Sequence, residues 1–115
     1  MERKALAIFW LVAGVMHFVI PKAYEAIVPK PLRRWKREIV VVSGVAEIAG
    51  GLAVLPERTR GGARWWLLGV LAAVYPANIQ MALNPDEYAR IPRAALWARL
   101  PLQFVAALHV WRGTR

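Results

Sequence analysis

Six polar side chains interrupt segments that are otherwise apolar, and their types could support proton exchange and ligand binding. Glu47 lies inside the stretch SGVAEIAGG, where small apolar residues surround it. A buried carboxylate is unfavourable unless it is protonated or paired with a cation, and His17 and Arg99 could supply that cation. Amide and phenol groups can hydrogen-bond the polar atoms of a bound molecule. The candidate site residues are His17, Glu47, Tyr75, Asn78, Arg99 and Gln103.

Each of these residues also has a purely structural interpretation. Glu47 and Arg99 could form an ion pair that fixes the register of two helices without any ligand. His17 could be a hydrogen-bonded residue close to lipid headgroups, whereas Asn78 and Gln103 could hydrogen-bond one helix to the next. Tyr75 precedes a proline, which removes a backbone donor and predicts a kink. The residue types therefore leave open both a ligand site and a structural polar layer.

Four long apolar segments must position these side chains. They cover about residues 5–20, 39–55, 63–83 and 94–111 of a single domain over residues 1–115. A helix of about 20 apolar residues crosses a bilayer core of about 30 Å, and helices satisfy their own backbone hydrogen bonds in hydrocarbon. The expected fold class is all-α, an integral membrane four-helix bundle with antiparallel up-down topology. A soluble apolar bundle is the alternative.

The antiparallel order allows the depths of the polar residues to be compared. At about 1.5 Å per residue, all six candidates lie roughly 5–14 Å from the end that carries the first connection. Helical spacing places Ser43 and Glu47 on one face, together with small residues that let helices approach closely. The pattern predicts that the six side chains form one polar layer inside the bundle.

Charge and cysteine content narrow the classes of function. The chain has 16 Lys and Arg against 7 Asp and Glu, which gives a net charge of +9. Most of the basic residues gather near the ends of the apolar segments, a pattern that favours anionic lipid headgroups over nucleic acid as the partner. The chain has no cysteine, which excludes disulfide and thiol chemistry within it. No metal site is predicted.

Four stretches, GVMHFVIP, SGVAEIAGG, YPANIQMA and RLPLQ, resemble the small DoxX-like membrane proteins, with one motif in each apolar segment. The resemblance implies a multi-pass protein of the bacterial inner (plasma) membrane. The founding member is associated with thiosulfate:quinone oxidoreduction, so the resemblance also implies a link to membrane redox processes. The signature positions that it implies are His17, Glu47, Asn78 and Gln103, with Pro76 and Pro101 beside them.

The expected function is that of an accessory or anchor subunit whose polar layer holds a quinone or a lipid headgroup. Quinone is the possible cofactor. The expected partners are the lipid bilayer, a redox protein or a second copy of the chain. Catalysis by the chain alone is not expected, because it has no cofactor motif of its own. Two alternatives stay open: a quinone-linked oxidoreductase subunit in which His17 and Glu47 exchange protons with the quinone, and a small proton-linked transporter that uses the same pair as its relay.

Overall fold

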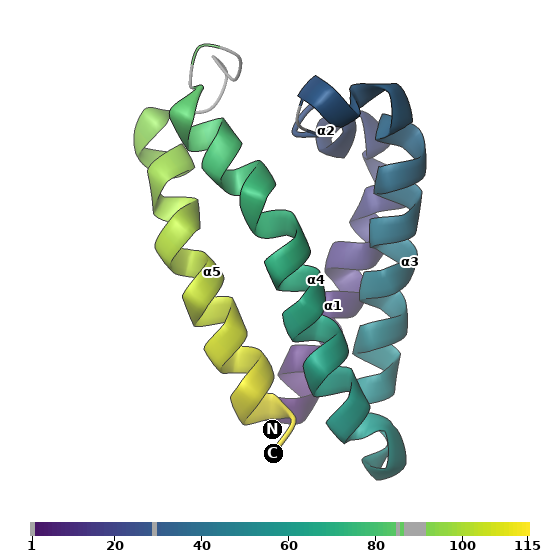
Figure 1. The fold of residues 1–115 in the computed structure, drawn as a ribbon. Helices are drawn as coiled ribbons and strands as arrows, with labels where there is room; N and C mark the ends of the chain where they lie inside the picture. The colour runs from purple at the N-terminus through teal and green to yellow at the C-terminus, as the bar shows by residue number, and fades with distance from the viewer. Residues whose placement is uncertain (1, 29, 85, 87–91) are drawn as a thin grey trace.

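The computed structural model describes residues 2–28, 30–84, 86 and 92–115, and nearly all of these residues are helical. The four long helices form an antiparallel bundle, and both termini lie at the same end of it (Figure 1). The elements in chain order are α1 (Glu2–Val19), α2 (Pro21–Glu25), the 3-10 helix η1 (Lys30–Trp35), α3 (Lys36–Val54), α4 (Glu57–Leu83) and α5 (Arg93–Gly113).

The prediction of a four-span integral membrane bundle is wrong. Among the described helices, only α4 is long and apolar enough, by length and composition, to cross a membrane. The predicted segments do coincide with the four long helices, but three of these helices carry too many polar groups. Charged residues occupy positions 2–4 of α1 and 36–38 of α3, and α5 contains Arg99, Gln103 and His109 in its interior turns.

Glycines allow α1 and α3 to pack closely along their length. A Cβ atom added to Gly14 would lie 2.8 Å from the carbonyl oxygen of Gly44, and one added to Gly44 would lie 2.9 Å from the Cβ of His17. Two turns further along these helices, a Cβ on Gly51 would lie 3.2 Å from the carbonyl oxygen of Ala7. Small residues at such positions let two helix backbones come together. The contact brings the side chains of His17 and Glu47 within reach of each other.

The main apolar core closes the end of the bundle that holds the termini. Arg64 on α4 ties the last turn of α5 to this end, because its Nε donates to Thr114 Oγ1 (3.0 Å) and its Nη2 donates to the Thr114 carbonyl (2.9 Å). Among the described residues at the opposite end, the buried apolar cluster consists of Met81 and Leu96, with Ile27 packed against it. There α4 and α5 diverge from α1 and α3 (Figure 1). The main core comprises Leu6, Ala7, Trp10, Val54, Ala63, Leu67, Leu71 and Val110.

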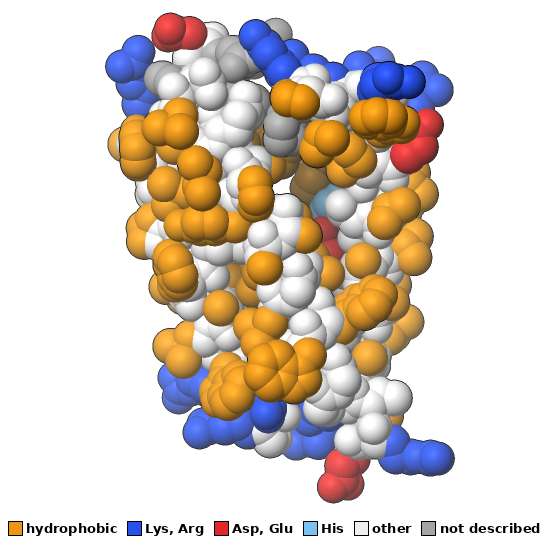
Figure 2. Space-filling view, in the orientation of Figure 1, with side chains coloured by type: hydrophobic (Ala, Val, Ile, Leu, Met, Phe, Trp, Pro, Cys, Tyr) orange, Lys and Arg blue, Asp and Glu red, His pale blue; other side chains and the backbone are white. Residues whose placement is uncertain are grey.

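Large apolar side chains are exposed around the middle of the molecule, and Lys and Arg gather at its two ends on the face shown in Figure 2. We call this exposed surface the apolar belt; it includes Phe9, Val42, Trp65, Leu83 and Phe104, the last of which is 66% exposed. Extended apolar surfaces of this kind mark contacts with other molecules. The lipid, redox-protein and self-association partners and the inner-membrane location stay predictions.

Candidate functional site

A cavity of about 640 Å³ lies between α1 and α3 on one side and α4 and α5 on the other. Figure 2 shows a hollow on the side of the molecule, rimmed by apolar side chains, with histidine and acidic atoms at its bottom. Most of the lining is apolar and includes Trp10, Val74 and Leu102. Convergent polar groups in a mainly apolar cavity are the usual form of a small-molecule site. The polar lining residues are His17, Tyr24, Ser43, Glu47, Asn78, Arg99 and Gln103.

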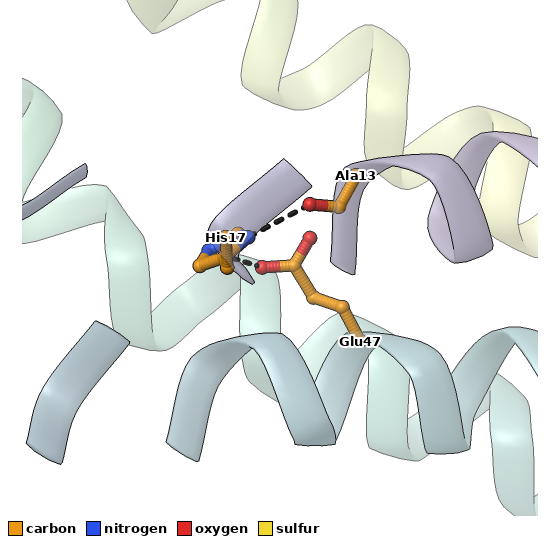
Figure 3. Close-up of polar contacts among 3 residues, drawn as sticks. All are labelled: Ala13, His17 and Glu47. Atoms are coloured by element: carbon orange, nitrogen blue, oxygen red, sulfur yellow. Dashed lines mark hydrogen bonds and ion pairs between the residues drawn. The ribbon is translucent and has the colours of Figure 1, made fainter. Parts of the chain in front are cut away.

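His17 and Glu47 form a hydrogen-bonded pair across the contact of α1 with α3 (Figure 3). His17 Nδ1 lies 2.7 Å from the carbonyl oxygen of Ala13, and Nε2 lies 3.1 Å from Glu47 Oε2. Because a carbonyl oxygen only accepts, Nδ1 carries a proton. The other nitrogen then either accepts a hydrogen bond from a protonated Glu47 or donates one to its carboxylate. In both arrangements the pair shares one proton and is electrically neutral.

The environment of Glu47 favours the protonated carboxyl. Glu47 is 7% exposed, and burial raises the pKa of its carboxyl group from 4.5 to about 7. A carboxyl whose pKa lies near neutrality can give up or take a proton under physiological conditions. The ion pair between Glu47 and Arg99 that the sequence allowed is not formed in the described part of the chain. Glu47 pairs with His17 instead of Arg99.

Asn78 and Gln103 join α4 to α5 where α4 contains Pro76. Asn78 Nδ2 donates to Gln103 Oε1 (2.9 Å), and Gln103 Nε2 donates to the Leu71 carbonyl (2.7 Å). Pro76 has no N–H, so the carbonyl of Ala72, the neighbour of Leu71, loses its usual helical donor. Among the described residues, Asn78 Oδ1 has no hydrogen-bond donor. The two amides thus connect the helices and still offer an acceptor to the cavity.

Replacing Gln103 with leucine should destabilise the fold by about 1–3 kcal/mol, because Asn78 Nδ2 would be left buried without an acceptor. The double variant Asn78→Leu, Gln103→Leu should recover a large part of this loss, since removing both partners leaves no orphaned donor. Chemical unfolding of the wild type and of the single and double variants measures the coupling. Purely additive effects of the two substitutions would show that this hydrogen bond does not couple the helices.

Tyr24 on α2 is a site residue that the sequence analysis missed. Its ring stacks on that of His17, with centroids 3.9 Å apart and planes at 20°. Burial raises the pKa of Tyr24, the charge of Glu47 adds to this effect, and Arg99 opposes it. The residue falls in the connection between two apolar segments, where the sequence pattern predicts a loop. The sequence signal that could have found α2 is Pro21 at its first position, because proline is favoured at helix starts.

Five of the six predicted site residues line the cavity, and their function stays a prediction. Tyr75 is not part of the lining: its ring packs edge-on against Phe104, with centroids 5.8 Å apart. Tyr75 and Asn78 are three residues apart, which leaves them about 60° apart around the helix axis. This rotation turns Tyr75 away from the cavity and against Phe104, an exposed side chain of α5. The residues in the lining are His17, Glu47, Asn78, Arg99 and Gln103.

Family comparison identifies the chain more narrowly than its motifs do. A family model described as a domain of unknown function, DUF8561, matches residues 6–114, so the chain belongs to this family. No curated protein and no solved structure matches the chain. The resemblance to DoxX-like proteins is wrong, because the family found is DUF8561. The four short motifs hold a few polar positions among common apolar residues, which is too little to define a family.

Proposed function

We propose that this member of the DUF8561 family is an accessory ligand-binding protein, whose cavity holds the polar head of an amphiphile such as a quinone or a lipid. The observation that carries the proposal is the convergence of His17, Glu47 and Asn78 in one cavity of about 640 Å³ with mainly apolar walls. That volume lies within the range of about 300–1,000 Å³ typical of small-molecule sites. The link to redox processes is not part of the proposal, because it depended on the DoxX resemblance.

The polar groups of the cavity suit the oxygen atoms of a headgroup. Asn78 Oδ1 is a free acceptor among the described residues, and the hydroxyl of Tyr24 can donate or accept. The shared proton of the His17–Glu47 pair lies between Nε2 and Oε2, which are 3.1 Å apart. Glu47 Oε1 has no hydrogen-bond donor among the described residues and can accept a hydrogen bond from the hydroxyl of a ligand. These groups can make two or three directed hydrogen bonds to a bound headgroup. That number is enough to orient the headgroup without a chemical reaction.

The opening of the cavity suits the apolar part of such a ligand. The hollow lies on the side of the bundle, rimmed by apolar side chains (Figure 2), and not at the basic ends. Phe9 belongs both to the cavity lining and to the apolar belt. A tail that leaves the cavity would therefore stay in contact with apolar surface, which favours burial by roughly 25 cal/mol per Å².

The test is to identify small molecules that co-purify with the protein. Wild-type protein is extracted with organic solvent, and the extract is analysed by mass spectrometry. The variant Ala77→Phe places a ring in the cavity lining, whereas Ala72→Phe places the same ring on an exposed position of the same helix. We expect an amphiphile at a defined ratio to the wild type and to Ala72→Phe, and its loss from Ala77→Phe.

The comparison is valid when both variants keep the helical circular dichroism of the wild type. If all three proteins carry the same molecules in the same amounts, those molecules are bound outside the cavity and the proposal fails. A wild type that carries none, and that takes up neither quinone nor lipid when these are added, also contradicts it.

A further inference from the structure

Arg99 is a cation of the cavity that has no counter-charge among the described residues. It lies on α5 in the cavity lining and is half-buried. Within the part of the chain that the structure describes, no carboxylate lies within ion-pair distance of Arg99, and no acceptor receives a hydrogen bond from it. The carboxylate that could have paired with it, Glu47, is held by His17 at 3.1 Å. The guanidinium therefore keeps all five of its N–H donors available.

The charge balance of the cavity is positive when His17 and Glu47 share one proton. The described titratable groups in its lining are His17, Tyr24, Glu47 and Arg99. The His17–Glu47 pair is neutral when it shares one proton, and the Tyr24 phenol is neutral, so Arg99 leaves one positive charge. A positive charge in a mainly apolar space is unfavourable unless an anion accompanies it.

We propose that the cavity binds an amphiphile with an anionic oxygen headgroup, a carboxylate or a phosphate on a long alkyl chain, and that Arg99 binds this headgroup. The inference rests on the proposed function and narrows its ligand class to anionic lipids. The planar guanidinium matches two oxygens of a carboxylate or phosphate at once. Tyr24 lines the same cavity, and its hydroxyl can donate a hydrogen bond to an oxygen of a bound headgroup.

Two other features of the site agree with this assignment. Asn78 Nδ2 and Gln103 Nε2 each use one of their two N–H groups within the protein. Arg99, with five N–H groups, is therefore the principal donor left among the described residues of α4 and α5 in the lining. Glu47 does not repel an anion when the pair with His17 is neutral. A quinone, which is uncharged, would leave Arg99 without a counter-charge.

The test compares probes that share an alkyl chain and differ in charge. Purified protein is titrated in one neutral detergent with palmitate, hexadecyl phosphate and hexadecanol, and separately with acetate and inorganic phosphate. We expect both anionic amphiphiles to bind about tenfold more tightly than the alcohol, as a charge-assisted pair with arginine predicts. The anions without a chain should bind at least tenfold more weakly than palmitate, which distinguishes a lipid headgroup from a free ion.

Substitutions test whether Arg99 causes the preference for anionic amphiphiles over the alcohol. Arg99→Gln should abolish the preference for palmitate and change the affinity for hexadecanol by less than about twofold, whereas Arg99→Lys should retain part of it. Arg58→Gln removes the same charge from an exposed position of α4 outside the cavity and should leave the preference intact. Equal affinities for palmitate and hexadecanol, or an equal loss of both in Arg99→Gln, would overturn the inference while leaving the proposed function standing. If no probe with a chain binds, the proposed function fails as well.

Discussion

Replacing Gly14 with alanine is expected to destabilise the bundle by about 2–3 kcal/mol and to lower its Tm by roughly 10 °C. The new Cβ would lie 2.8 Å from the carbonyl oxygen of Gly44 and 3.0 Å from the backbone nitrogen of Ile48. Backbone atoms cannot move aside by changing rotamer, so α1 and α3 must separate. Thermal unfolding followed by circular dichroism measures the effect.

Gly69→Ala is the matched control for this prediction. A Cβ at Gly69 meets nothing within 4 Å, so the same substitution should stabilise α4 by up to about 1 kcal/mol through helix propensity. Because His17 lies one turn beyond Gly14, separation of the two helices should also lengthen its contact with Glu47. A Gly14→Ala variant with the stability of the wild type would show that the packing of α1 on α3 is looser than described.

Substitution of Glu47 should separate its hydrogen-bonding role from its charge. Glu47→Ala leaves the Nε2 atom of His17 without its partner and opens a void, with an expected cost of about 3 kcal/mol. Glu47→Gln should be much milder, because its amide can donate to His17 Nε2 as a protonated carboxyl does. Urea unfolding at neutral pH compares the two variants with the wild type.

The pH dependence of stability reports the raised pKa of Glu47. Its pKa is about 7 in the folded protein against an ordinary value of 4.5, so between these values the folded state binds a proton that the unfolded state lacks. This contribution to wild-type stability is complete below pH 4.5 and is lost as pH rises through about 7. Relative to the wild type, Glu47→Gln should therefore gain stability across that window. A stability difference that does not change between pH 4.5 and 8 would contradict the raised pKa.

The positions of the long helices could be predicted from the sequence, whereas their environment could not. Apolar segments such as 39–55 and 63–83 coincide with α3 and α4 because hydrophobic runs bounded by proline and charge favour helices. Their interpretation as four membrane spans was wrong, because only α4 keeps a sufficiently apolar stretch of span length. The short α2 was missed, since five residues carry too little periodicity to distinguish a helix from a loop.

The polar layer could be anticipated from depth, but its pairing required the structure. Depth along antiparallel helices grouped all six candidate residues, and the cavity lining contains five of them but not Tyr75. Depth along the helices does not determine whether His17 or Arg99 pairs with Glu47. That choice depends on the rotation of α1 and α3, which the close contact at Gly14 and Gly44 sets.

The most direct test of the cavity as a binding site uses the two histidines of the chain. His17 lies in the cavity, whereas His109 lies outside the lining on α5, with its ring 6.5 Å from that of Phe9. Protein labelled with ¹⁵N in its histidine rings is titrated with palmitate and with hexadecanol, and the ring signals are followed by NMR. Binding in the cavity predicts that the His17 signals shift in a saturable manner and by much more than the His109 signals. If the His17 signals do not move with either probe, or if the His109 signals move by as much as those of His17, the cavity is not the binding site.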